Sequence, residues 1–234
     1  MRILVINGNT SQDITDFLAA QARGAASPGT EIVPLTAGFG AEVIAGRRDN
    51  AIGAPAVLAL LEAHAAGVDA AIIATSLDTG LAAAREAASF PIVGLTEATL
   101  LSACMLGGRF GLVVFDRRTM PLYRELVESY GLAARLATIS VLDVTAAEVW
   151  ARPEAVTPEL AKRVRLAVAE HGAECIAVLG AVAVALAGRL QPESPVPVLA
   201  PMQCAVLQAE LMARLRLPKP TAGSHAPPVR RSAP

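Results

Sequence analysis

The sequence has few aromatic residues, no excess of either charge and no long hydrophobic run, and each absence excludes a class of protein. Aromatic residues make up 3% of the 234 residues, and 20 basic residues nearly balance 21 acidic ones. The stacking platforms and positive field of a nucleic-acid-binding protein are missing, so we expect no nucleic-acid partner. Gly, Pro or charge interrupts every apolar run before the ~20 residues that span a bilayer, so we expect no membrane partner.

Cysteine is also scarce, which argues against both a disulfide framework and a zinc site. The three cysteines are Cys104, Cys175 and Cys204. Their number is odd, their spacing is wide and they form no CxxC pair. Each stands among apolar residues, so we interpret them as buried, inert thiols. The three histidines are scattered as well, and we predict no metal and no cofactor, although carboxylate ligands would leave no comparable spacing signal.

Apolar residues, in contrast, are plentiful. They make up 53% of the chain and charged residues only 18%, which is enough to build a substantial core in one large or two small domains. A strand-like segment begins at once after Met1 and leaves no room for a signal peptide. We therefore expect a compact, soluble and cytoplasmic protein.

Strand-like and helix-like segments alternate along the chain, and the second half repeats the pattern of the first. Strands are expected at 2–7, 31–36, 69–74, 91–97, 109–115, 137–142, 174–180 and 197–201, and helices at 12–23, 54–66, 81–88, 122–130 and 158–171. This pattern predicts an α/β fold of two pseudo-symmetric, doubly wound lobes with parallel sheets and an interdomain active-site cleft.

The same pattern predicts the division of the chain. The first lobe would contain residues 1–100 and a C-terminal helix at about 203–217, and the second lobe would contain residues 101–202. Residues 218–234 are rich in proline and cannot bury much apolar surface, so we expect a flexible tail. The alanine-rich helices would allow close packing against a second copy, so a homo-oligomer is a further expectation.

Polar side chains collect where the buried strand before Thr75 ends. Thr75, Ser76 and Asp78 follow an apolar run, and a helix-like segment comes directly after them. In open α/β sheets ligands bind at this end of the strands, where free N–H groups of the next helix attract anions. The alternative interpretation is a capped turn without a ligand, with Thr79 as the helix cap.

Other strand ends carry similar side chains. Asn7 and Asn9 follow the first strand, and Thr96 and Glu97 end the fourth. Arg47 and Arg48 stand together on a predicted loop, where they are either solvated or bind a carboxylate through paired hydrogen bonds.

Several of these stretches, in order, resemble the aspartate/glutamate/hydantoin racemase superfamily and are closest to its hydantoin and allantoin racemases. They are residues 3–10, with Gly8 where the family usually has Pro; Ile44 with Gly46 and Asp49; Ala74 and Thr75 with Asp78, Gly80 and Leu81; Val93 and Gly94 with Glu97 and Ala98; and residues 178–180. The resemblance covers Met1 to about Leu217 and implies a pair of α/β lobes.

The resemblance also implies two catalytic cysteines, one from each lobe, which this chain lacks. The first would fall at Thr75 and the second at Ala181. The family's hydroxyl pair after the fifth strand becomes Val113 and Val114, and an acidic residue becomes Gln203. An alanine cannot transfer a proton and an unassisted threonine is a very weak acid, so we do not expect two-base racemisation.

We therefore predict a cofactor-independent enzyme that acts on a small hydantoin-like ring or carboxylic acid. The preferred reaction is hydrolytic, for example removal of sulfur from a thiohydantoin-propionate; the alternatives are a decarboxylase, isomerase or racemase of the same superfamily, and a non-catalytic protein that binds a small carboxylate. The predicted catalytic residues are Thr75, Asp78 and Glu97. The predicted substrate-binding residues are Asn7, Asn9, Ile44, Arg47, Arg48, Ser76, Thr96, Gly180, Ala181 and Gln203.

Overall fold

The first lobe of the molecule is built around one parallel sheet. The structure is a computed structural model that describes residues 1–180, 186–220 and 222–226. The strands of the first sheet are β1 (Arg2–Asn7), β2 (Glu31–Thr36), β3 (Ala70–Ile73) and β4 (Ile92–Gly94). Its helices are α1 (Gln12–Ala25), α2 (Arg47–His64), α3 (Leu81–Ala87) and, from the other end of the chain, α9 (Pro201–Leu215). The strand order is β2-β1-β3-β4.

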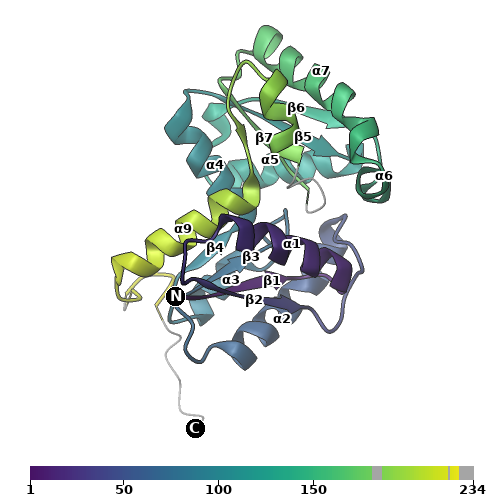
Figure 1. Ribbon diagram of the computed structural model, residues 1–234. Coiled ribbons are helices and arrows are strands. Elements are labelled where there is room, and N and C mark those ends of the chain that lie inside the picture. The colour runs from purple at the N-terminus through teal and green to yellow at the C-terminus, as the bar shows by residue number, and fades with distance from the viewer. Residues whose placement is uncertain (181–185, 221, 227–234) are drawn as a thin grey trace.

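The second lobe repeats this architecture (Figure 1). Its strands are β5 (Phe110–Phe115), β6 (Leu136–Leu142), β7 (Cys175–Val178) and β8 (Val198–Leu199), in the equivalent order β6-β5-β7-β8. Its helices are α4 (Leu95–Leu106), α5 (Met120–Ser129), α6 (Ala146–Ala151), α7 (Pro153–His171) and α8 (Leu186–Leu190), with short 3-10 helices at Arg117–Thr119, Ala133–Arg135 and Gln191–Glu193. The predicted α/β class and the pair of parallel-sheet lobes are confirmed.

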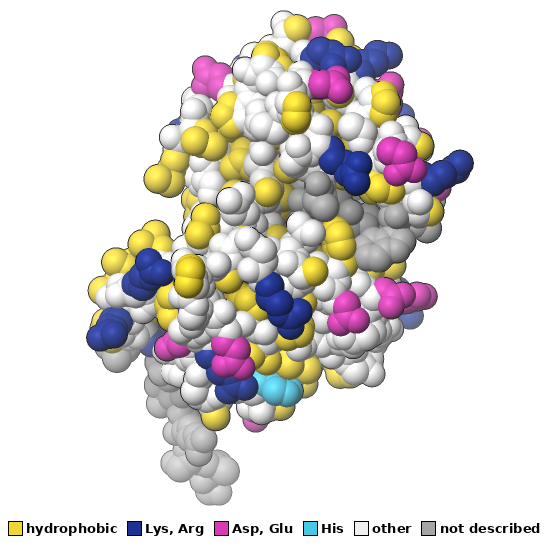
Figure 2. Space-filling view, in the orientation of Figure 1, with side chains coloured by type: hydrophobic (Ala, Val, Ile, Leu, Met, Phe, Trp, Pro, Cys, Tyr) yellow, Lys and Arg dark blue, Asp and Glu magenta, His cyan; other side chains and the backbone are white. Residues whose placement is uncertain are grey.

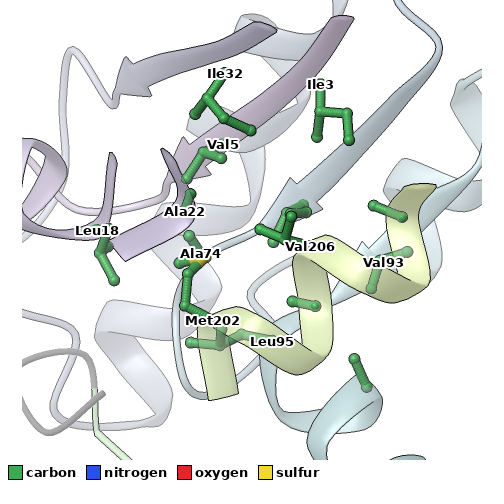
Figure 3. Packing of buried hydrophobic residues seen from close by; sticks show 14 of the residues in the cluster. Ile3, Val5, Leu18, Ala22, Ile32, Ala74, Val93, Leu95, Met202 and Val206 are labelled. Atoms are coloured by element: carbon green, nitrogen blue, oxygen red, sulfur yellow. The ribbon is translucent and has the colours of Figure 1, made fainter. Parts of the chain in front are cut away.

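Both faces of the first sheet are covered by helices, and its central strands carry buried apolar side chains on both faces. Successive side chains of a strand point to opposite faces. Ile3 and Val5 therefore pack with α1 and α9, whereas Leu4 and Ile6 pack with α2 and α3. Figure 3 shows Met202 of α9 close to this first group. Each fully buried side chain of this size contributes about 1.5–3 kcal/mol.

Two helices connect the lobes. In α4, Leu95 and Ala98 belong to the core of the first lobe, and Leu100 and Ala103 belong to a core of the second. The C-terminal helix α9 returns to the first lobe and packs against α1 and α4. These two crossings place the carboxyl ends of the two sheets against each other.

Two helix starts change where predicted site residues lie. Helix α2 begins at Arg47 rather than at residue 54, so Arg47 and Arg48 lie in its first turn and not on a loop. Helix α4 begins at Leu95, so Thr96 and Glu97 lie in a helix and not at a strand end. In α4 the cap is the carboxylate of Asp78, which accepts hydrogen bonds from the backbone N–H groups of Thr96 and Glu97. A cap from so distant a residue leaves no local sequence signal.

The outer surface bears on the remaining expectations. Within the described ranges, no helix combines the length and the apolar character that crossing a membrane requires. Exposed leucine and methionine side chains gather on α4 and α9, and Figure 2 shows hydrophobic side chains over α9. The homo-oligomer stays a prediction. In the predicted tail, residues 222–226 form turns and bends, and residues 218–220 belong to no helix or strand.

Candidate active site

A cavity of about 300 Å³ lies where the two lobes face each other, and we call it the interlobe cleft. Three loops that follow strands in each lobe line it. The first lobe contributes Asn9 after β1, Ile44 after β2 and Ser76 after β3, and the second contributes Asp116 after β5, Thr145 after β6 and Gly180 after β7. The carboxyl ends of the strands therefore form this cavity, as expected for a ligand site in α/β sheets.

Ser76 is held by a tyrosine from the opposite lobe. The hydroxyl of Tyr123, on α5, donates a hydrogen bond of 2.9 Å to Ser76 Oγ, and both residues line the interlobe cleft. Burial raises the pKa of Tyr123 to about 12, so its phenol stays protonated and keeps donating at neutral pH. Because Ser76 Oγ accepts this bond, its own proton can be donated to a ligand.

Thr75, next to Ser76, is arranged differently. Its hydroxyl donates to Thr79 Oγ1 at 2.9 Å and accepts from the Thr79 backbone N–H at 3.1 Å. The Thr79 hydroxyl in turn donates to Asn50 Oδ1 at 2.7 Å. The proton of Thr75 is therefore used within the protein, and the side chain is only 4% exposed. Its predicted catalytic role stays a prediction, and Ala181, its predicted counterpart, lies outside the described residues.

Asp78 faces away from the interlobe cleft. It lines a separate hollow of about 700 Å³ together with Arg85, Glu97 and Tyr130. Its carboxylate accepts hydrogen bonds from the N–H groups of Thr96 at 3.0 Å and Glu97 at 2.8 Å, and from the Tyr130 hydroxyl at 2.6 Å. Burial raises the pKa of Asp78 to about 7, although these hydrogen bonds lower it.

Glu97 lines the same hollow and forms an ion pair with Arg85. One guanidinium nitrogen, Nη1, donates to Glu97 Oε1 at 2.8 Å, and Nη2 donates to the other oxygen. Both oxygens of the Glu97 carboxylate are therefore occupied by Arg85. The structure thus brings two of the predicted catalytic residues, Asp78 and Glu97, together with each other and separates them from the interlobe cleft.

The cleft wall of the second lobe carries a charged pair. Asp116 follows β5 directly and has a positive φ of 62°, a conformation that non-glycine residues rarely adopt. Arg118 donates to both Asp116 oxygens, at 3.1 and 3.0 Å from Nε, and lowers the pKa of this carboxyl group. Asp116 is thus ionised at neutral pH. The strand-end rule that identified Ser76 applies equally to Asp116, whereas nothing in the sequence places Tyr123 here.

The remaining predicted binding residues are divided among three places. Asn9, Ile44 and Gly180 line the interlobe cleft. Asn7 and Thr96 lie behind it: the Asn7 amide donates to Asn9 Oδ1 at 2.7 Å, and the Thr96 hydroxyl donates to the Ser76 carbonyl at 2.7 Å. Arg47 pairs with Glu125 of α5, and Arg48 and Gln203 are exposed in the first turns of α2 and α9.

No cysteine is among the residues that the structure places around the interlobe cleft. Cys175 is buried in β7, and burial raises its pKa to about 11. Cys104 and Cys204 are partly exposed, against the prediction that all three are buried. The described residues contain no group of three or more His, Cys, Asp or Glu side chains that could hold a metal ion.

Known proteins share both this sequence pattern and this architecture. The family model Asp/Glu/Hydantoin racemase matches residues 3–209. A hydantoin racemase of Pseudomonas sp. (strain NS671) is 34% identical over 92% of this chain and 87% of its own length. One from Paenarthrobacter aurescens is 31% identical over 98% of both chains. The structure of an allantoin racemase from Pseudomonas fluorescens superimposes with a TM-score of 0.94, at 33% identity, over 100% of this chain and 99% of that one. The chain belongs to the Asp/Glu/hydantoin racemase family.

Proposed function

We propose that the interlobe cleft binds a hydantoin-type ring and that the protein hydrolyses it without thiol chemistry. Relatives named hydantoin racemase and allantoin racemase support the ring class. The choice of hydrolysis rests on one observation. Hydroxyl, amide and carboxylate groups surround the described cleft, and no thiol is among them. The positions where the resemblance implies cysteines are Thr75 and Ala181.

The cleft offers partners for each edge of such a ring, which carries carbonyl oxygens and N–H groups. The Ser76 hydroxyl, oriented by Tyr123, donates to a carbonyl oxygen. Asn9 uses its side-chain oxygen to accept bonds from Asn7 and Ser11, so its amide nitrogen is left to donate to a second carbonyl. The ionised Asp116 accepts from a ring N–H.

Hydrolysis places new demands on two of these groups. Water adds to a ring carbonyl carbon, and negative charge develops on the oxygen that Ser76 holds, which is where a donor lowers the barrier. Asp116, which lines the cleft, orients the water, and the ring C–N bond breaks as the water's proton passes to the departing nitrogen. In a thiohydantoin, the same addition to the thiocarbonyl carbon ends with the departure of hydrogen sulfide and leaves a carbonyl. The carboxylate of a propionate arm would then meet Arg118, because Arg118 lines the interlobe cleft and Arg47 does not.

Racemisation is the second candidate, and the similar proteins support it better than they support hydrolysis, because they carry the name racemase. It requires an oxygen acid and an oxygen base on opposite faces of the ring carbon that carries the substituent. Ser76 and Asp116 line the cleft from opposite lobes, which supports giving them these two roles. The lowered pKa of Asp116 makes it a weak base for a carbon acid, which favours hydrolysis.

One incubation separates the candidates. Single enantiomers of substituted hydantoins and a thiohydantoin-propionate are incubated in deuterium oxide with the protein, with Ser76→Ala and without protein. We expect ring opening or sulfide release that depends on Ser76. Protein-dependent deuterium incorporation at the substituted carbon with loss of optical rotation, and no hydrolysis, would establish a racemase instead. Thermal stabilisation by an unchanged ring compound would indicate a binding protein.

A further inference from the structure

The two tyrosines of this chain, Tyr123 and Tyr130, are seven residues apart on α5 and at its C-terminal end. Seven residues make two turns of an α-helix, so both side chains lie on one face. That face meets the first lobe, at the loop between β3 and α3 that contains Ser76 and Asp78.

Each tyrosine donates a hydrogen bond to this loop. Tyr123 binds Ser76 Oγ at 2.9 Å inside the interlobe cleft, and Tyr130 binds Asp78 Oδ2 at 2.6 Å outside it. Leu77, between the two acceptors, packs in a core of the second lobe that also contains Tyr123. The second lobe therefore holds the loop at both ends and in the middle.

Asp78 is a rigid partner for Tyr130. Its two oxygens also accept the backbone N–H groups of Thr96 and Glu97, at the start of α4. A Cβ atom on Gly94 would come within 2.7 Å of the Asp78 carboxyl carbon, so there is no room for this side chain to shift towards β4. Tyr130 is consequently tied to the framework of the first lobe and not to a mobile side chain.

We propose that Tyr130 is a positioning residue whose hydrogen bond to Asp78 sets the rotation of α5 and thereby keeps the Tyr123 hydroxyl on Ser76. This gives Asp78 a role in organising the interlobe cleft from outside it. The effect on turnover rests on the proposed function, whereas the coupling of the two tyrosines does not.

The coupling can be measured without a substrate, because the chain has only two tyrosines. Protein labelled with fluorotyrosine gives one fluorine resonance from each, and Tyr130→Phe leaves that of Tyr123 alone. We expect the Tyr123 resonance in Tyr130→Phe to move towards that of solvent-exposed fluorotyrosine. Ser129→Ala is the matched control, since its hydroxyl donates to Leu126 O within α5, and should leave the resonance unchanged.

An unchanged Tyr123 resonance in Tyr130→Phe, or an equal change in Ser129→Ala, would overturn the coupling. With a ring substrate, Tyr130→Phe should reduce kcat on the order of tenfold with little change in KM, because the weakened donor acts on the developing charge. A shifted resonance with unchanged kcat would refute the catalytic consequence. Absence of activity on every ring compound would count against the proposed function, and the fluorine result would still decide the coupling.

Discussion

Replacing Gly94 with alanine should destabilise the protein far more than a single added methyl group normally does. The new Cβ would lie 2.7 Å from both Asp78 Cγ and Leu81 Cδ2, and 2.8 Å from Asp78 Oδ2. Real Cβ atoms are not found so close to other heavy atoms, so the Asp78 side chain has to move. It cannot do so without lengthening its bonds to Thr96, Glu97 and Tyr130.

The magnitude follows from two contributions. Overpacking in a well-packed site costs about 1–3 kcal/mol. Loss of a hydrogen bond to a charged group costs about 1.5–3 kcal/mol more. We therefore expect Gly94→Ala to lower the free energy of unfolding by about 2.5–6 kcal/mol, and to loosen the start of α4 and the Tyr130 contact together.

Gly24→Ala is the matched control for this measurement. Gly24 lies in α1, and a Cβ added there meets nothing within 4 Å. Alanine in a helix is favoured over glycine by about 0.5–1 kcal/mol, so this variant should be slightly more stable. The assay is equilibrium urea unfolding of both variants and the parent protein. A Gly94→Ala protein as stable as the parent would show that the packing around Asp78 is not as tight as described.

Three further predictions concern pH, catalysis and thiol chemistry. Burial raises the pKa of Asp78 from 3.8 to about 7, so the unfolded chain loses this proton at a lower pH than the folded protein does. The contribution of Asp78 to the free energy of unfolding should therefore fall by about 4 kcal/mol between pH 4 and 7 and stay constant above pH 7. The difference in unfolding free energy between the parent and Asp78→Asn, measured across this range, tests the sign, and a pH-independent difference would contradict it. Ser76→Ala should reduce kcat on a ring substrate by about 10²–10³-fold, since it removes the donor to the developing charge; an active variant would exclude this role. Cys175 should react with a thiol reagent far more slowly than Cys104, because it is buried and its pKa is about 11; equal rates, followed by mass spectrometry of the modified peptides, would argue against the described packing.

The sequence alone determined the architecture because burial of parallel strands leaves a strong local signal. Residues 70–73 are four apolar residues in a row, and all four are buried in β3. The alternation of such runs with helix-like segments was enough to predict two α/β lobes. The strand-end rule likewise predicted Asn9 and Ser76 as binding residues, and the family resemblance pointed to Gly180; the structure places all three around the interlobe cleft, where their roles await the tests above.

Tertiary structure decided which of the remaining polar groups meet. The start of α4 depends on the Asp78 carboxylate, which is distant in sequence from Thr96 and Glu97, and no local pattern encodes such a cap. The same bonds turn Asp78 away from the cleft. Tyr123 reaches Ser76 only because α5 of one lobe packs on the other. Contacts between the lobes depend on how the two folded lobes dock, and this docking leaves no periodic pattern in the sequence.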